Sequence, residues 1–392
     1  MPRLLFLGTL LLIAQATSSP QCDNSSANGT VNTAPIVVNG GPTNNSFNEP
    51  FTSVTVCVPG TSNCQTIGGI LVDTGSSGLR VLSSALTLPL PQQTGAGGAP
   101  VVECLPFVDG FTWGPVSMAD IQMVGERAAS VPIQVIGLDT FGTVPSGCSS
   151  QGPAEETQID LVANGVLGIG SFIQDCGRGC TLTGSSNPAL YYACPTPTSC
   201  QVTAQPLANQ VQNPVALFSS DNNGVAIQLP AVAAGGQPSV AGTLIFGIGT
   251  QSNNALGSAR VLTLNSRGNI TTTFNGQSYP NSFVDSGSNG IFFLDSAASG
   301  LPECKSSTGF YCPPTTRTFS ATQVGANGVS VAVTFAAGNV DAANSTFSAF
   351  GEATGRNPGS FDWGLPFLYG RTFFSAIEGR STPGGVGPYW AY

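Results

Sequence analysis

ILVDTGSSGLRV, residues 70–81, places a carboxylate at the end of an apolar run and follows it at once with a glycine-rich turn. An ionised Asp73 at the end of a buried strand would lose its hydration, and hydrogen-bond donors from the protein must replace the lost water. Asp and Gly are also common in ordinary turns. A single copy of the pattern therefore does not separate a functional carboxylate from a turn residue.

A second stretch, SFVDSGSNGIFFL at residues 282–294, repeats the pattern around Asp285. Both copies read apolar, apolar, Asp, Thr or Ser, Gly, Ser, and an apolar run follows the next glycine. Two similar carboxylates in two similar segments predict one site that is built by two related parts of the chain.

The small polar residues after each Asp have predictable roles. Hydroxyl groups at Thr74 and Ser286 can tie one turn to the other. Those at Ser76 and Ser288 can donate to the outer carboxylate oxygens. Two glycines allow backbone to pack against backbone where the turns meet: Gly75 and Gly287.

Paired carboxylates would titrate as a unit. At a separation of about 4 Å and an effective dielectric constant near 20, their repulsion is roughly 4 kcal/mol, or about three pKa units. One proton is then held between them at mildly acid pH, so that the ionised member can take a proton from water while the protonated member polarises a carbonyl group. The chain has no histidine, which excludes a Ser-His-Asp triad, a Cys-His dyad and any zinc site with a His ligand.

The composition predicts many short strands joined by turns. The chain has 392 residues, 50 Gly and 29 Pro, and only 8% of its residues are charged. This length favours two domains with a large core. The net charge of −9 argues against nucleic acid and anionic membranes as partners, because both require a basic face.

The beginning of the chain reads as a secretory signal. Residues 1–19 combine Arg3 with a short apolar run, and residues 20–35 are a polar segment that we expect to be disordered. No stretch is long enough for a membrane span. The protein is therefore expected to be secreted, periplasmic or in the cell envelope. A lipid anchor at Cys22 is a further possibility, although Ser19-Pro20-Gln21 is a poor version of the small-residue box that it would want. The sequence does not otherwise give the fate of Cys22.

Eleven cysteines in a secreted chain indicate disulfides. Cys57 and Cys64 flank a PGTSN turn and would meet across a hairpin, although two separate buried thiols remain an alternative. Cys304 and Cys312 are natural partners. A zinc site is the alternative for four of the other cysteines, with poor spacing for it: Cys176, Cys180, Cys194 and Cys200. The sequence does not give the pairing of these four or of Cys104 and Cys148.

The chain resembles the pepsin-like aspartic proteases. Asp73-Thr74-Gly75-Ser76 and Asp285-Ser286-Gly287-Ser288 are similar to the two catalytic motifs of that family. Further segments resemble the flap hairpin, the two glycine elements that pair with the motifs and the connections between lobes: FTWGPVSMADIQMVG (111–125), NGVLGIG (164–170), FDWGLPFLYGRTFFSAIEG (361–379), PVALFS (214–219) and GTLIFGIG (242–249). The segments TWGP, DNNG, TQSNNALG and PYWAY also look like those of a bacterial secreted or lipoprotein family of undetermined function.

The resemblance implies an all-β, bilobal fold with pseudo-twofold lobes. The N-terminal lobe would cover residues 36–230, and the C-terminal lobe, with the connection between the lobes, residues 231–392. The polarity pattern around Gly114-Pro115 predicts two strands with a turn near Thr112-Trp113-Gly114.

Two positions depart from the family. Arg80 stands where many pepsins have an aromatic residue that supports the flap, and Trp113 stands where a flap tyrosine is common. These residues and Gly114 are candidates for the flap and for substrate binding, and Arg80 and Trp113 could form a cation–π pair. The alternatives are a solvated surface arginine and a simple buried aromatic ring.

The function implied by the resemblance is a secreted aspartic endopeptidase. Asp73 and Asp285 would activate a water molecule for attack on a peptide carbonyl at acid pH. Such an enzyme needs no cofactor or metal, acts on a peptide or protein substrate and is expected to be a monomer. The alternative is a catalytically silent envelope binding protein with the same fold, and a zinc or redox protein built on the cysteines is a third reading.

Overall fold

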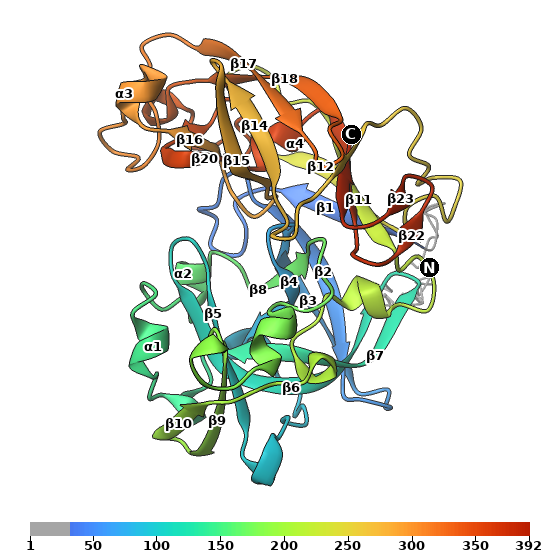
Figure 1. Cartoon of the computed structure of the whole chain (residues 1–392). Helices are drawn as coiled ribbons and strands as arrows, with labels where there is room; N and C mark the ends of the chain where they lie inside the picture. The colour runs from blue at the N-terminus through green and yellow to red at the C-terminus, as the bar shows by residue number, and fades with distance from the viewer. Residues whose placement is uncertain (1–31) are drawn as a thin grey trace, which may run out of the picture. The chain divides into compact units, whose positions relative to one another are not determined.

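Short strands make up most of the structure, and the predicted all-β, bilobal fold is confirmed (Figure 1). The computed structural model describes residues 32–392, which belong to one compact unit. The predicted signal peptide and Cys22 lie outside the described residues. No helix in this part of the chain is long and apolar enough to cross a membrane.

The strands of residues 32–392 form three sheets. The largest has fifteen strands in the order β10 (Ser199–Val202), β9 (Tyr191–Thr196), β5 (Val101–Pro106), β6 (Phe111–Met123), β7 (Glu126–Ile136), β4 (Ser77–Leu82), β8 (Gly165–Ile169), β3 (Cys64–Asp73), β2 (Pro50–Cys57), β1 (Thr33–Val38), β12 (Val240–Phe246), β11 (Gly224–Leu229), β21 (Arg371–Ala376), β24 (Tyr389–Ala391) and β13 (Val261–Thr263). The second has seven, in the order β18 (Ser330–Ala337), β17 (Arg317–Val324), β14 (Ile270–Phe274), β15 (Gln277–Val284), β20 (Asn357–Trp363), β16 (Ile291–Leu294) and β19 (Thr354–Gly355). The third pairs β22 (Ser381–Thr382) with β23 (Gly385–Val386). The α-helices are single turns: α1 (Ser146–Ser149), α2 (Gln158–Leu161), α3 (Ser296–Ser299) and α4 (Leu365–Leu368).

The same strand arrangement surrounds both Asp motifs. β3 pairs in parallel with β8, so that Asp73 lies opposite Gly168, and β8 continues antiparallel to β4. In the second lobe β15 pairs in parallel with β20, so that Val284 lies opposite Trp363, and β20 pairs antiparallel with β16. The glycine elements predicted to pair with the motifs are β8 and β20. This repetition is the pseudo-twofold relation between the lobes.

The largest sheet connects the two lobes. β1 pairs with β12, and β11 pairs with both β12 and β21, so strands from the beginning, middle and end of the chain share one layer. β1 begins at Thr33, three residues before the predicted start of the N-terminal lobe, because residues 33–35 already pair with residues 243–245. The predicted boundary between the lobes at residue 230 lies between β11 and β12 and stays a prediction.

Aromatic rings fill the core of the second lobe. β20 places Phe361 and Trp363 on its buried face, where the two rings stack with centroids 5.4 Å apart. Phe293 packs on Phe361 and Phe335 packs on Trp363, each at 5.3 Å. Side chains alternate along a strand, so Asp362 points to the opposite face of β20.

Five disulfides occur among residues 32–392. The predicted pairs Cys57–Cys64 and Cys304–Cys312 are confirmed. The pairs that the sequence left open are Cys104–Cys148, Cys176–Cys180 and Cys194–Cys200. The zinc alternative is wrong, because the sulfur atoms of its four cysteines are bonded to one another in pairs.

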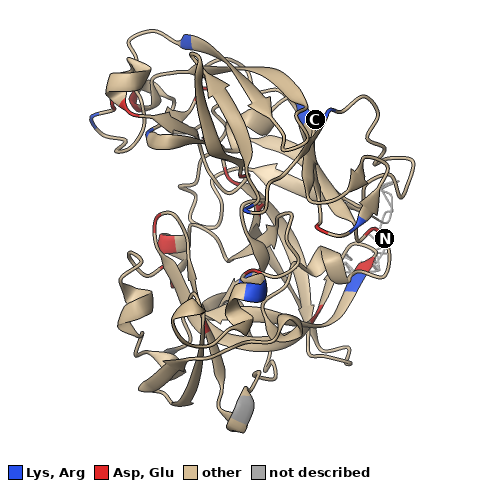
Figure 2. Ribbon diagram, in the orientation of Figure 1, with Lys and Arg blue, Asp and Glu red and all other residues tan. Residues whose placement is uncertain are grey.

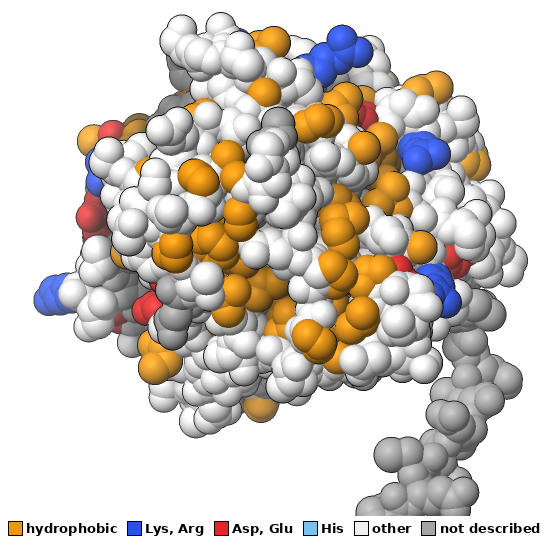
Figure 3. All heavy atoms as spheres, turned by 90° about the horizontal axis from the view of Figure 1, so that it is seen from below, with side chains coloured by type: hydrophobic (Ala, Val, Ile, Leu, Met, Phe, Trp, Pro, Cys, Tyr) orange, Lys and Arg blue, Asp and Glu red, His pale blue; other side chains and the backbone are white. Residues whose placement is uncertain are grey.

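Charged side chains are few and scattered over the ribbon (Figure 2). On the face shown in Figure 3, apolar side chains are exposed in a band between polar ones, with only a few charged groups around them. Acidic residues outnumber basic ones by 20 to 11 in the whole chain. Buried carboxyl groups must therefore often be stabilised by something other than an ion pair.

A first prediction concerns the close packing of β20 on the second motif. A Cβ atom on Gly364 would collide with the backbone carbonyl oxygens of Ser288 and Gly290, which cannot move independently of the motif. Gly364→Ala should lower the free energy of unfolding by about 2–4 kcal/mol, measured by urea denaturation. Gly351→Ala is the matched control, because its nearest neighbours would be 3.8 Å away. Equal stability of the two variants would contradict the packing argument.

Candidate active site

Hydrogen bonds that cross between the lobes hold the two motif turns together. The Thr74 backbone N–H donates to Ser286 Oγ at 3.1 Å, and the Ser286 backbone N–H donates to Thr74 Oγ1 at 2.9 Å. Ser286 Oγ also donates to the Val72 carbonyl oxygen at 2.6 Å. The predicted tie between the two hydroxyl-bearing residues is therefore present, and it fixes the separation of the carboxyl groups on either side.

Each carboxyl group receives the same two donors. Asp73 Oδ1 accepts the Gly75 N–H at 2.6 Å, and Ser76 Oγ donates to Asp73 Oδ2. Asp285 Oδ1 accepts the Gly287 N–H at 2.8 Å, and its Oδ2 lies 3.0 Å from Ser288 Oγ. The six residues predicted to surround the pair all lie where the sequence placed them: Thr74, Gly75, Ser76, Ser286, Gly287 and Ser288.

The glycine of each turn faces the carboxyl group of the other lobe. A Cβ atom on Gly75 would lie 2.6 Å from Asp285 Cγ, and one on Gly287 would lie 3.1 Å from Asp73 Oδ1. Any side chain here would push the two carboxyl groups apart. Glycine at both positions is what lets Asp73 and Asp285 come together.

The two carboxyl groups affect each other's titration. Burial holds the pKa of Asp285 well above its usual range, and the charge of Asp73 and a hydrogen bond to its side chain raise that pKa further. Asp285 therefore retains a proton that an isolated aspartate would lose. This agrees with the shared proton expected from the sequence.

A third carboxyl group, Asp362 on β20, reaches the site and was missed by the sequence reasoning. Ser288 Oγ lies 2.7 Å from Asp362 Oδ2, so one hydroxyl connects Asp362 with Asp285. Burial raises the pKa of Asp362 to about 7. The signal in the sequence was an acidic residue within the otherwise apolar FDWG segment. The segment was assigned to a glycine element of the pepsin-like family, and its Asp was given no role.

A cavity of about 560 Å³ opens above the pair. Residues 73–77 of the first motif line it together with Val284 and Asp285 of the second. Residues 105–108, from the end of β5 and the turn after it, also line it. Apolar rings contribute from both lobes: Phe107, Phe172, Phe283 and Trp390. Arg267, on the exposed loop before β14, is the basic side chain in this lining. The carboxyl pair thus faces a cleft with room for an extended chain.

The flap prediction for Trp113 is wrong. The hairpin of β5 and β6 turns at residues 107–110, where the Phe107 N–H donates to the Gly110 carbonyl oxygen, so Trp113 lies within β6 opposite Cys104. The Trp113 side chain is buried, packs against Tyr192 at 5.3 Å and donates from Nε1 to the Phe141 carbonyl oxygen. The alternative of a buried aromatic ring is the correct one.

Gly114 was part of the same prediction. A Cβ atom there would collide with the Val135 carbonyl oxygen of β7, so Gly114 permits strand packing and does not form a flap tip. Gly114-Pro115 looked like a turn, but Pro115 stays in the ladder opposite Val102. The true turn was marked by Asp109-Gly110. Its neighbours Phe107 and Val108 line the cleft.

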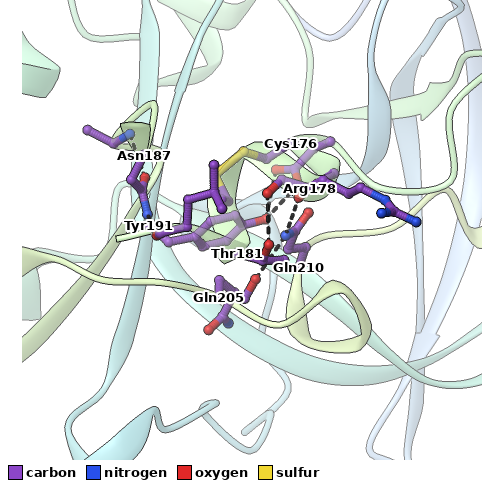
Figure 4. The surroundings of a disulfide bond; sticks show 12 residues. Cys176, Arg178, Thr181, Asn187, Tyr191, Gln205 and Gln210 are labelled. Carbon is purple, nitrogen blue, oxygen red and sulfur yellow. Dashed lines mark hydrogen bonds between the residues drawn. A yellow bond between two sulfur atoms is a disulfide. The ribbon is translucent and has the colours of Figure 1, made fainter. Parts of the chain in front are cut away.

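Arg80 is neither stacked on Trp113 nor solvated. Its side chain is completely buried and forms ion pairs with Glu103 at 2.7 Å and with Asp175 at 3.2 Å. Tyr191 donates its hydroxyl to Asp175 at 2.7 Å, and the Tyr191 ring lies beside the Cys176–Cys180 disulfide (Figure 4). Arg80 therefore pairs with two buried carboxyl groups, and one of them, Asp175, lines the cleft. Burial and Glu103 nevertheless hold the pKa of Asp175 well above its usual range.

Comparison with known families gives the chain its classification. Residues 28–392 match the model of a family described as "Protein of unknown function (DUF3443)". The chain belongs to this family. A search of curated proteins finds no match.

Comparison with solved structures supports the fold. An aspartic proteinase from Irpex lacteus matches with a TM-score of 0.50 and 14% identity, over 92% of this chain and 96% of that one. At this identity the likeness shows the pepsin-like fold and nothing about activity. The family description likewise assigns no activity.

A second prediction tests the tie between the lobes. Ser286→Ala would leave the Thr74 N–H without its acceptor and the Val72 carbonyl oxygen without its donor, both in a buried position. The free energy of unfolding should fall by about 2–3 kcal/mol in chemical denaturation. Ser330→Ala, at an exposed strand position, is the control and should change stability little. A loss no larger than that of the control would show that the tie does not stabilise the fold.

A third prediction tests the buried ion pairs. Arg80→Met would leave Glu103 and Asp175 buried without a cation, at a cost of about 3–5 kcal/mol near neutral pH. Burial and the nearby Glu103 already hold the pKa of Asp175 well above its usual range, and Arg80 opposes that rise. Without Arg80 the folded-state pKa of Asp175 should rise further, so the cost should grow as the pH rises and be smallest in acid. Thermal unfolding at acid and neutral pH measures this. The control Arg127→Met removes a side chain that is 53% exposed and pairs with Asp120, and it should cost no more than about 1 kcal/mol. A loss for Arg80→Met that does not depend on pH would contradict the account.

Proposed function

We propose that the protein is a secreted aspartic endopeptidase. The observation that carries the proposal is the carboxyl pair itself: Asp73 and Asp285 meet across the two lobes, each held by a backbone N–H and a serine hydroxyl, at the floor of a cleft. Such a pair can act as base and acid in one step. The resemblance to the aspartic proteases implies the same division of roles for Asp73 and Asp285.

The electrostatics assign a role to each carboxyl group. Asp285 holds the proton, because burial and the charge of Asp73 favour its neutral form. Asp73 is then the ionised partner and takes a proton from a water molecule as the water oxygen bonds to the peptide carbon. Asp285 gives its proton to the carbonyl oxygen. The diol then collapses: Asp73 passes the proton that it took from water to the amide nitrogen, a diol hydroxyl returns a proton to Asp285, and the C–N bond breaks. The products are a carboxylic acid and an amine, and no covalent intermediate with the protein forms.

The cleft lining supports a peptide with apolar side chains as substrate. Aromatic rings stand on both sides of the pair, with Phe172 from the first lobe and Phe283 and Trp390 from the second. Phe107 and Val108 line the cleft from the β5–β6 turn, and Val108 is 94% exposed. An exposed apolar side chain beside a cleft is well suited to cover a bound peptide.

The disulfides support action outside the cytoplasm. Five disulfides persist only under oxidising conditions in most organisms, which fits the predicted secretory signal. The monomeric state, the absence of a cofactor and the lipid anchor at Cys22 remain predictions.

A fourth prediction tests the proposed activity. Asp73→Asn and Asp285→Asn should each lower the cleavage rate of a denatured protein substrate by a factor on the order of 10²–10⁴ or more, because each removes one half of the acid–base step. Wild-type activity should lie on the acid side and should fall as the pH rises far enough for Asp285 to lose the proton that the acid step needs.

The control is Asp160→Asn, which removes an exposed carboxylate from α2. Unchanged cleavage in both Asp73→Asn and Asp285→Asn would refute the assignment. If the wild type cleaves nothing between about pH 3 and about pH 8, the silent binding protein is the better reading. Tight binding of a statine-like transition-state mimic that disappears in Asp73→Asn would favour the enzyme.

A further inference from the structure

The two lobes differ at a pair of facing strand positions beside the carboxyl pair. In the first lobe Arg80 of β4 lies opposite Val166 of β8, and in the second lobe the matching pair is Phe292 of β16 opposite Asp362 of β20. The strand pairing next to the motifs is the same in both lobes, β3–β8–β4 in the first and β15–β20–β16 in the second. The second lobe therefore presents a carboxyl group where the first presents an aliphatic side chain.

This difference changes the hydrogen bonding of the motif serine. Ser76 donates to Asp73 alone among the carboxyl groups of its lobe, whereas the Ser288 hydroxyl lies 3.0 Å from Asp285 Oδ2 and 2.7 Å from Asp362 Oδ2. A hydroxyl has one proton to donate and can accept another. Both contacts are satisfied at once only if one of the two carboxyl groups is protonated and donates to Ser288.

Among the described residues, the Ser288 hydroxyl is the compensation found for a charge on Asp362. The residue is only 5% exposed, and its Oδ1 atom has no hydrogen-bond partner among the described residues. Directly across from it in the neighbouring strands stand Phe283 and Phe292. Within residues 32–392, no basic side chain forms an ion pair with it.

The ionisable groups that act on Asp362 are those of the carboxyl pair. β16, β20 and α4 carry no other ionisable side chain, and the one on β15, Tyr279, packs on the opposite face against Phe361 at 5.3 Å. The charge of Asp73 adds to burial in raising the pKa of Asp362 to about 7. In return, the charge of Asp362 helps to hold the pKa of Asp285 above its usual range, after burial and Asp73.

We propose that Asp362 is a positioning residue that acts on Asp285 through the Ser288 hydroxyl and keeps the acid of the carboxyl pair protonated toward neutral pH. The proposal rests on the proposed function, because it assigns Asp285 the role of acid. When Asp362 is ionised, Asp285 donates to Ser288 and Ser288 donates to Asp362, so the proton is held at Asp285 by a hydrogen-bonded chain that ends in a negative charge. The pair is then one part of a group of three carboxyl groups that titrate together.

The test compares Asp362→Asn with the wild type. The asparagine keeps the shape and can donate to Ser288, but it carries no charge, so the fall of kcat/KM at the alkaline side should move to lower pH. The rate at the acid optimum should change little, because Asp362 is protonated there. Asp362→Val introduces the residue that the first lobe has at the equivalent position, Val166. It replaces Asp362→Asn in the test if that variant fails to fold, and its alkaline fall of kcat/KM should move in the same direction. Glu303→Gln removes an exposed charge of the same lobe and should leave the profile in place.

A second readout does not depend on catalysis. Because the pKa of Asp362 rises from 3.8 to about 7 on folding, its ionisation lowers the stability of the wild type as the pH climbs through this interval. The Tm of Asp362→Asn relative to the wild type should therefore increase over the same interval and level off above it. In an Asp285→Asn background this increase should be smaller, since one of the two interacting groups is gone.

The outcomes separate the two proposals. If the wild type cleaves, and kcat/KM of Asp362→Asn falls over the same alkaline pH range as kcat/KM of the wild type, the proposed role of Asp362 is wrong. The proposed endopeptidase activity would still stand. If the wild type cleaves nothing, the proposed function is wrong. The dependence of Tm on pH then tests by itself whether Asp362 and Asp285 interact. An equal Tm difference with and without Asp285 would show that Asp362 does not act on it.

Discussion

The reciprocal hydrogen bonds between Thr74 and Ser286 are the constraint on which the site depends. Each turn donates a backbone N–H to a hydroxyl oxygen of the other turn, so neither turn satisfies all its hydrogen bonds within its own lobe. Buried N–H groups without acceptors are costly, and this cost keeps the lobes together at this point. Several features bring these two turns within hydrogen-bonding distance of each other. They are the glycines, the parallel strand pairs and the shared sheet of β1, β11, β12 and β21.

The low content of basic residues shapes the electrostatics of the whole fold. Arg80 pairs with both Glu103 and Asp175, yet the pKa of Asp175 stays well above its usual range, and other buried carboxyl groups rely on protons too. Burial raises the pKa of Glu49 and of Glu155 to about 8, in addition to the effect on Asp362. Groups whose pKa rises on folding bind protons more tightly in the native state, so they favour the fold in acid and lose that advantage as the pH rises toward those values. A site that shares a proton between carboxyl groups fits such a molecule.

The two lobes show how one backbone plan can carry different chemistry. The motif turns and their donors are repeated, and the equivalent residues Thr74 and Ser286 are 212 positions apart. Beside them, the first lobe buries Arg80 with two carboxylates, whereas the second packs Phe292 next to Asp362. A symmetric pair of carboxyl groups has to become asymmetric to act as acid and base. The differing neighbours supply that asymmetry without any change in the turns.

The sequence by itself determined the fold class, the carboxyl pair with its six neighbouring residues and two of the disulfides. These features follow from short local patterns, such as a repeated motif and a turn between two cysteines, whose meaning does not depend on distant residues. Trp113, Gly114 and Arg80 were misplaced because strand register and burial decide their roles, and neither is written in the local pattern. Asp362 was missed for the same reason: only the pairing of β20 with β15 and β16 brings its carboxyl group to Ser288. The tertiary structure alone decided that the site contains three carboxyl groups and not two, because contact across strands sets which charges meet.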